Sequence, residues 1–237
     1  MKKKVERKEY ILEYDMTFAN IFSISLLLFM IILTALLVIL LRVKGFINLL
    51  YEKYIIFFIL MILWMVLHEI IHGISYQIMG AKGKNIVFGA SLENGVFYCK
   101  CKEYVDKKCI MTSLLAPFIL IGVFTYVLGF LIKSPLLIAL SVINISGASG
   151  DLMMFNFFLK QESDVEFKEL GFSSPFVLRT SKNLIGEKFI GIKSIREVKD
   201  ESETYEGPEK KLTISKTSWF FIIVMLVLIV LMLVLKV

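Results

Sequence analysis

Long uninterrupted apolar runs, rather than alternating or helically spaced apolar residues, dominate the pattern of this chain. Crossing the hydrocarbon core of a bilayer takes about 20 apolar residues. Five runs have about this length or more: Met16–Leu41, Tyr54–Ala81, Cys109–Ile132, Ser134–Leu159 and Thr217–Leu235. So short a chain has too little polar sequence left to cover five buried core helices. We therefore predict an all-α membrane protein with about five transmembrane helices.

The polar stretches between the runs divide the predicted protein into four parts. They are an N-terminal cytoplasmic arm with the first transmembrane helix (1–53), a membrane-embedded core (54–160), a short cytoplasmic segment and linker (161–216), and a C-terminal transmembrane helix (217–237). Inside the third part, Phe189 to Ile192 with Ile195 predict one or two strands. The acidic stretch from Lys199 to Lys211 predicts a flexible linker.

Composition and charge agree with a membrane location and set its orientation. Hydrophobic residues make up 57% of the chain, and the mean hydropathy is +0.75, far above that of an ordinary soluble domain. The net charge of +6 gathers in the N-terminal arm and in the loop 82–108. The positive-inside rule therefore places the N-terminus, this loop and 161–216 in the cytoplasm. The basic residues suit an anionic lipid surface, and no nucleic-acid motif is present, so we predict no nucleic-acid partner.

The only two histidines of the chain lie four residues apart, in His68-Glu69-Ile70-Ile71-His72. On an α-helix this spacing brings two imidazoles to one face, where both can bind a zinc ion, and it leaves Glu69 able to reach a zinc-activated water. The alternative is a helix that carries these side chains on a packed or hydrated face. The motif also excludes a serine-type triad, because no further histidine exists.

Asp151 is the only charged residue of the fourth apolar run, and on the predicted topology it lies at the depth of the two histidines. A carboxylate in hydrocarbon is costly unless it is paired, hydrated or bound to metal. A catalytic zinc commonly has three protein ligands, so Asp151 is the predicted third; a side chain that extends to the cytoplasmic surface is the alternative. The small residues 146–150 let the helix approach its neighbours or break. Rival third ligands lie outside the apolar runs: Glu93, Glu103, Asp106, Glu162 and Asp164.

These motifs resemble a group of bacterial membrane proteins described as zincin peptidases, and beyond it the site-2-protease family of intramembrane zinc metallopeptidases. The resemblance covers about residues 54–160 and is carried by His68 to Gly73, Gly95 to Tyr98, Ala116-Pro117-Phe118, and Asn144 to Asp151. It implies zinc ligation by His68, His72 and Asp151, a catalytic Glu69 and a supporting Asn144. It also implies a multi-pass protein of the bacterial plasma membrane. Site-2 proteases typically have Pro and Leu-Asp-Gly after the Asn, whereas this chain has no such Pro.

The loop between the second and third runs predicts a small cytoplasmic β-hairpin. Asn94-Gly95 is a typical two-residue turn, flanked by Ile86 to Phe88 and by Val96 to Tyr98. The hairpin could add an unwound substrate to its edge or could simply pack on the membrane face. Three cysteines lie in or just after it: Cys99, Cys101 and Cys109. They could bind metal or form a redox pair, but a cytoplasmic location favours free thiols.

The sequence therefore predicts a zinc metalloendopeptidase that hydrolyses peptide bonds of membrane or membrane-proximal substrates by zinc-activated water. Two alternatives remain. One is a catalytically inactive metal-binding membrane protein that acts as a sensor, a partner-binding protein or a transport accessory. The other is a zincin that trims soluble or surface peptides at the cytoplasmic face. The expected partners are a peptide or membrane-protein substrate and the lipid bilayer; the oligomeric state is not predicted.

Overall fold

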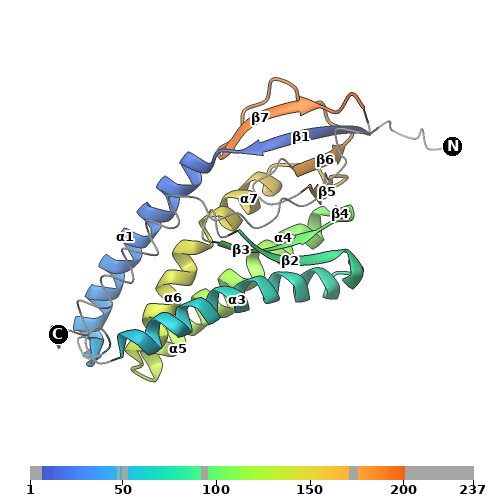
Figure 1. The fold of residues 1–237 in the computed structure, drawn as a ribbon. Coiled ribbons are helices and arrows are strands. Elements are labelled where there is room, and N and C mark those ends of the chain that lie inside the picture. Colours follow the sequence, from blue (N-terminus) through green and yellow to red (C-terminus); the bar gives the residue numbers. More distant parts are fainter. Residues whose placement is uncertain (1–6, 47–48, 50–52, 92–95, 171–175, 201–237) are drawn as a thin grey trace.

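The computed structural model describes residues 7–46, 49, 53–91, 96–170 and 176–200. The predicted fifth span, most of the predicted linker, the Asn94-Gly95 turn and Glu93 lie outside these residues. Figure 1 shows a group of long helices with a β-sheet at one end.

Among the described residues, three helices are long and apolar enough to cross a membrane. They are α1 (Met16–Leu41), α3 (Tyr54–Ile78), and the continuous helix Lys107–Leu131, which is made of α4 (Lys107–Pro117), a π-helical turn (Phe118–Val123) and α5 (Phe124–Leu131). A fourth candidate is the pair α6 (Pro135–Gly147) and α7 (Ser149–Leu159), bent by 47°. The short 3₁₀ helix Gly83–Asn85 follows α3.

The helix starts follow from local capping. The Asp15 carboxylate accepts the amide of Phe18 at the start of α1, and the Asp106 carboxylate accepts the amide of Cys109 at the start of α4. Ser134 caps α6, whose first residue is Pro135, a residue suited to that position because it lacks an amide hydrogen. These three helices therefore begin within two residues of the starts of the apolar runs that the sequence predicted.

The prediction of an all-α protein is wrong. A five-stranded antiparallel sheet has the order β4-β5-β6-β1-β7, and a separate pair is formed by β2 and β3. The strands are β1 (Lys8–Tyr14), β2 (Ile86–Ser91), β3 (Val96–Cys101), β4 (Val105–Asp106), β5 (Glu166–Glu169), β6 (Phe176–Thr180) and β7 (Ile192–Glu197). The fold is therefore mixed α/β, with helices that can span a membrane joined to a sheet.

The sequence did not predict the sheet, because several of its strands are short and their partner strands are distant in sequence. β1 lies in the arm that the sequence indicated as a charged cytoplasmic tail, yet Tyr10, Ile11 and Leu12 are fully buried in it. It pairs with β6 on one side and with β7 on the other, both more than 150 residues away. β7 overlaps only the end of the predicted strand region, since residues 189–191 precede it.

The sheet is fixed to the helices by an aromatic core. Phe157 and Phe158, at the end of α7, make edge contacts with Phe176 and Phe167 of the sheet, at ring-centroid distances of 6.1 and 5.3 Å. All four rings are at most 1% exposed. Burial of each such side chain stabilises the fold by about 1.5–3 kcal/mol. This core holds α7, and hence Asp151 near its start, in a fixed position relative to the sheet.

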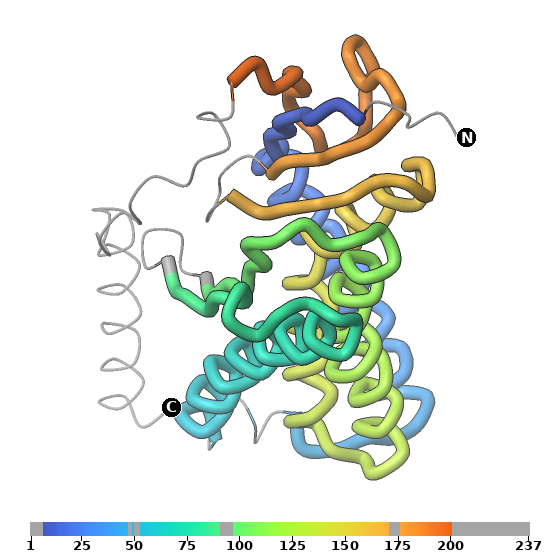
Figure 2. Tube along the Cα trace, turned by 90° about the vertical axis from the view of Figure 1, so that its right-hand side faces the viewer, coloured from blue at the N-terminus to red at the C-terminus, as the bar shows by residue number. Residues whose placement is uncertain are grey.

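The β2–β3 pair confirms the predicted hairpin strands. Their register runs from Ile86 opposite Cys101 to Ser91 opposite Val96. The hairpin packs on α3, and Gly73 permits the close approach, because any side chain there would collide with the Phe88 ring. Figure 2 shows the hairpin between the helices and the sheet. It therefore lies beside the helix that carries the histidine motif.

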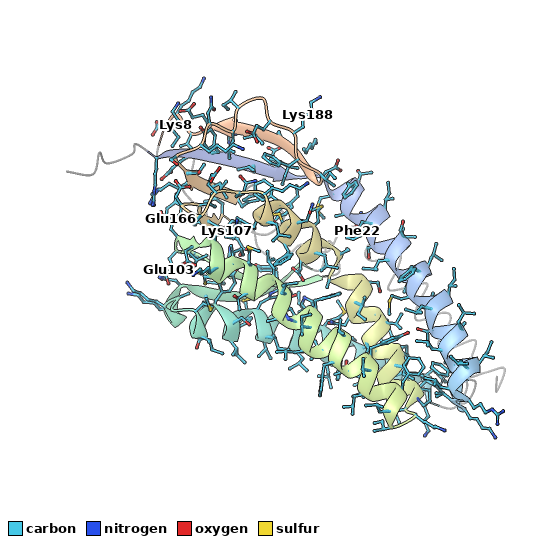
Figure 3. The ribbon with its side chains drawn as sticks, turned by 180° about the vertical axis from the view of Figure 1, so that it is seen from behind. Lys8, Phe22, Glu103, Lys107, Glu166 and Lys188 are labelled. Atoms are coloured by element: carbon cyan, nitrogen blue, oxygen red, sulfur yellow. The ribbon has the colours of Figure 1, made fainter. Side chains whose placement is uncertain are left out.

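The sheet end of the molecule brings together parts of the three segments that the charge pattern assigned to the cytoplasm. The sheet includes the N-terminal arm, the end of the loop 82–108, and strands from 161–200. The charged residues labelled in Figure 3, which include Lys8, Glu103 and Lys188, lie at this end. By contrast, α1 exposes much of its apolar surface, with Ile39 75% and Leu40 74% exposed. Which side of a membrane the sheet occupies stays a prediction.

Candidate metal centre

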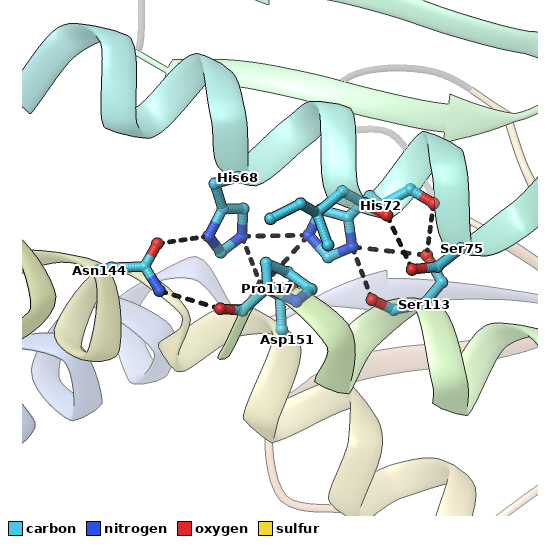
Figure 4. Close-up of polar contacts among 8 residues, drawn as sticks. His68, His72, Ser75, Ser113, Pro117, Asn144 and Asp151 are labelled. Atoms are coloured by element: carbon cyan, nitrogen blue, oxygen red, sulfur yellow. Dashed lines mark hydrogen bonds and ion pairs between the residues drawn. The ribbon is translucent and has the colours of Figure 1, made fainter. Parts of the chain in front are cut away.

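His68 and His72 lie one turn apart in the second half of α3 and point toward α4 and α7 (Figure 4). Their ring centroids are 4.8 Å apart, and their Nε2 atoms are 3.1 Å apart. His72 is 7% exposed, so little water reaches its ring. The helical spacing has thus brought two ring nitrogens to a common point, as the sequence predicted.

Asp151 reaches the same point from the first turn of α7. Its Oδ2 atom lies 3.0 Å from Nε2 of His68 and 3.4 Å from Nε2 of His72. Four ligands arranged tetrahedrally around zinc, at about 2.0–2.1 Å, lie about 3.3 Å from one another. The three atoms therefore have separations that fit three ligands of one zinc ion.

The break between α6 and α7 aims Asp151 at the histidines. Ala148 separates α6 from α7, which starts at Ser149 with a change of direction of 47°. This break falls in the run of small residues 146–150, in agreement with the prediction that these residues allow a helix to break near the site. The bend changes the direction of the helix axis just before Asp151, and the Asp151 carboxylate lies beside both histidines.

The other ring nitrogen of each histidine is engaged by an oxygen atom. Nδ1 of His68 lies 2.9 Å from Oδ1 of Asn144, and Nδ1 of His72 lies 2.9 Å from the carbonyl oxygen of Ser113. Asn144 is oriented by its own amide group, which donates to the carbonyl oxygen of Pro117 at 3.2 Å. Each oxygen atom accepts the hydrogen of the Nδ1 atom that faces it, so a neutral ring of either histidine would present its lone pair at Nε2.

This assignment makes the donor set suited to a cation. Two Nε2 lone pairs and one carboxylate oxygen converge within 3.4 Å, and neutral rings with hydrogen on Nδ1 supply no proton between them. Three such acceptors repel one another unless a positive charge lies between them. Imidazole nitrogen and carboxylate oxygen are common zinc ligands, so the residues fit a zinc ion. Their role as ligands stays a prediction.

Glu69 lies beside this group without joining the triangle. One carboxylate oxygen of Glu69 and one ring nitrogen from each of His68 and His72 lie within 4.8 Å of one another. The backbone amide of Cys99, on β3, hydrogen-bonds the Glu69 carboxylate. The hairpin therefore fixes the side chain that the sequence predicted as catalytic, and it does so through a backbone group that no sequence pattern identifies.

The four predicted rivals of Asp151 that the structure describes are not found in this group. The Glu103 carboxylate accepts the amide of Asn85 and the backbone amide of Lys82, and Asp106 caps α4. The Asp164 carboxylate accepts the backbone amide of Ser181. Glu162 is exposed on the turn after α7, and Glu93 lies outside the described residues. Of the described candidates, only Asp151 is within reach of both histidines.

The three cysteines form no disulfide. Burial raises the pKa of the Cys101 thiol to about 11 and raises that of Cys99 above its usual range. Both therefore carry their proton at neutral pH and are poor metal ligands and nucleophiles, since the thiolate is the reactive form. This agrees with free cysteines on the hairpin, as predicted.

A pocket of about 260 Å³ opens onto the site between α3, α6, α7 and β3. One end is formed by His68, Glu69, Asn144 and Asp151. The rest is apolar, apart from two glycines, and is lined by Met61, Trp64, Met65, Phe97, Leu140, Ile143, Gly147 and Gly150. Trp64 is fixed by a hydrogen bond from its Nε1 to the carbonyl oxygen of Ile121, in the π-helical turn. A substrate can thus reach the predicted catalytic groups from one side.

The outer edge of β3 is partly occupied. The amides of Cys99 and Cys101 both point away from β2, since the first hydrogen-bonds Glu69 and the second donates to the Glu169 carboxylate at 3.1 Å. Outward amides alternate along a strand, so Phe97 provides the next one, at the pocket. Addition of a substrate strand to this edge stays a prediction, and it is restricted to the end of β3 at Phe97.

Comparison with known proteins supports a zincin. Residues 61–165 match a family described as "Putative zincin peptidase". This range contains His68, Glu69, His72, Asn144 and Asp151. Neither the curated proteins nor the solved structures contain a match to this chain. The match thus supports the zincin part of the resemblance, whereas the likeness to site-2 proteases stays a prediction.

Proposed function

We propose that this protein is a membrane zinc metallopeptidase that hydrolyses peptide bonds at the pocket beside His68, Glu69 and Asp151. The carrying observation is the triangle of Nε2, Nε2 and Oδ2 atoms with sides of 3.0, 3.1 and 3.4 Å. Its two rings are held in the metal-binding tautomer by Asn144 and by the Ser113 carbonyl. The match to the zincin family gives independent support.

When bound, zinc would supply a Lewis acid that polarises the scissile carbonyl and acidifies water. Glu69 would take a proton from the attacking water, whose oxygen forms the new bond to the carbonyl carbon. As the carbon–nitrogen bond breaks, Glu69 would return that proton to the leaving amine. The Cys99 amide orients the Glu69 carboxylate for both transfers.

The surroundings favour substrates in or next to a membrane. Two helices that contribute to the site, α3 and Lys107–Leu131, are long and apolar enough to cross a bilayer, and α1 exposes large apolar side chains along its length. Exposed apolar surface of this extent marks contact with lipid or protein. His68 lies ten residues before Ile78, or about 15 Å along α3 from the end of the helix that faces the sheet. We therefore place the site in the half of the membrane next to the sheet.

The test compares the full chain with Glu69→Gln, both purified in detergent with zinc. The amide has the size of the acid but cannot accept a proton at neutral pH. We expect zinc content near one per chain in both proteins and a loss of peptide cleavage of about 100-fold or more in Glu69→Gln. Equal cleavage would show that another group activates water. If zinc is bound and no peptide is cleaved by the wild-type chain, the non-enzymatic metal-binding protein becomes the better description.

A further inference from the structure

The apolar part of the pocket is continuous with the predicted catalytic groups. His68, Glu69 and Asp151 line the same pocket as Trp64, Met65 and Ile143. A peptide whose scissile carbonyl lies at the site must therefore place a neighbouring group in this apolar space. No described charged side chain other than Glu69 and Asp151 lines it.

The volume suits one large side chain. An apolar cavity of about 150 Å³ in a protein is enough to hold benzene. The pocket measures about 260 Å³, so a leucine, methionine or phenylalanine side chain fits, with room for part of the backbone. The aromatic Trp64 and Phe97 and the flexible Met61 and Met65 offer apolar contacts to such a group.

Two glycines keep this space open. A Cβ atom built on Gly147 or on Gly150 meets nothing within 4 Å, and neither residue has the positive φ that would favour glycine. Gly73 is different, because a side chain there would collide with Phe88. Neither backbone conformation nor packing thus requires glycine at 147 or 150, and the effect of both glycines is to leave the pocket unfilled.

We propose that this pocket binds a large apolar side chain of the substrate residue beside the scissile bond, and that Gly147 and Gly150 determine this specificity by leaving it room. The inference rests on the proposed peptidase function and adds its substrate class. The occupant is a side chain of the bound peptide because the pocket leads directly to the groups that would cleave it.

The test measures binding rather than cleavage. Glycine hydroxamate and leucine hydroxamate carry the same zinc-binding group and differ only in the side chain. Trp64 reports binding by fluorescence in a full-length Trp219→Phe background, since the chain has two tryptophans. Burial of the leucine side chain should make leucine hydroxamate bind about 10- to 100-fold tighter than glycine hydroxamate.

Gly147→Leu fills the pocket and should reduce this affinity ratio to near one. Gly147→Ala is the matched control, because it changes the same backbone position but adds one carbon, and it should keep most of the ratio. Zinc content and thermal stability check the folding of each variant. If Gly147→Leu does not fold, Gly150→Leu fills the same pocket from α7.

The outcomes separate the inference from the function on which it rests. Equal affinity of the two hydroxamates in the wild type, or a ratio unchanged in folded Gly147→Leu and Gly150→Leu, would overturn the inference while leaving the peptidase intact. Binding of neither hydroxamate, or binding unaffected by His68→Ala, would overturn both. Quenching of Trp64 by phosphatidylcholine with brominated acyl chains, without a preference for leucine hydroxamate, would assign the pocket to a lipid chain instead.

Discussion

Asn144 offers a sharp test of how the structure prepares the predicted metal centre, because it hydrogen-bonds His68 at Nδ1 while Nε2 of the same ring faces His72 and Asp151. It accepts from Nδ1 of His68 at 2.9 Å and donates to the Pro117 carbonyl at 3.2 Å, and it is 6% exposed. Asn144→Ala removes both contacts. His68 then loses the partner that keeps its hydrogen on Nδ1 and its lone pair on Nε2.

The expected magnitude follows from these contacts. Removal of an outer hydrogen-bond partner of a metal-binding histidine typically lowers metal affinity by about 10- to 100-fold. This corresponds to about 1.4–2.8 kcal/mol, which is also the scale of leaving one buried polar group unsatisfied. We expect the zinc dissociation constant of Asn144→Ala to rise by this factor. Competition with a fluorescent zinc chelator, at fixed pH and in detergent, measures it.

Two further variants separate positioning of His68 from general destabilisation. Ser141→Ala is the matched control: Ser141 is buried on the same helix, α6, and is hydrogen-bonded to Thr125 and Leu137, but it does not contact a histidine. It should lower thermal stability without changing zinc affinity. Asn144→Asp keeps an acceptor for Nδ1 and should retain most of the affinity. The reasoning is refuted if Ser141→Ala weakens zinc as much as Asn144→Ala does.

Three other predictions concern the ligand set, the topology and the sheet. Loss of an outer hydrogen-bond partner lowers zinc affinity by roughly 100-fold at most, and Asp151→Ala, which removes a predicted ligand, should lower it by more. Glu103→Ala should leave zinc affinity unchanged. Reporter fusions after Lys108 should report cytoplasm, and fusions at Lys133 the exterior. Burial raises the pKa of Glu169 to about 8, so the folded state keeps a proton that the unfolded chain loses as the pH rises from about 4.5. Stability should therefore fall by up to about 1.4 kcal/mol per pH unit until about pH 8, and Glu169→Gln should remove this loss in melting experiments.

Each of these predictions has a result that would contradict it. Zinc binding that survives Asp151→Ala would exclude it as the third ligand. An exterior signal after Lys108 would invert the topology. If Glu162→Gln, an exposed control, gives the same pH-dependent gain as Glu169→Gln, the effect does not arise from the half-buried Glu169 carboxyl group.

The helices were predictable because their signal is local. The run Met16–Leu41 became α1 with the same bounds, and Tyr54–Ala81 became α3 with a slightly earlier end. The sheet was not predictable from the same pattern. β5 has four residues and β4 has two, and neither has enough alternation to distinguish a strand from a loop. Their pairing depends on contacts between segments that are distant in sequence, which residue patterns along the chain do not encode.

In the candidate site, the side-chain contacts could be predicted from the sequence, whereas the backbone contacts could not. Convergence of His68, His72 and Asp151 could be anticipated, since the helical spacing and the shared depth both depend on residue type. The carbonyl of Ser113 and the amide of Cys99 could not, because every residue except proline has the same two backbone groups. Asn144 was accessible only through the resemblance to a family, whereas the structure gives it two definite contacts.

The sheet that sequence analysis missed also bears on how the site is built. Asp151 lies on α7, a short helix bent by 47° from α6, so its direction depends on the elements that pack against it. The aromatic contacts of Phe157 and Phe158 with the sheet supply that constraint at the far end of α7. The Cys101 amide bond to Glu169 ties β3 to the same sheet, and the next outward amide of β3 holds Glu69. The sheet therefore positions the predicted third ligand and the predicted catalytic carboxylate relative to the histidines of α3, through one strand and one helix.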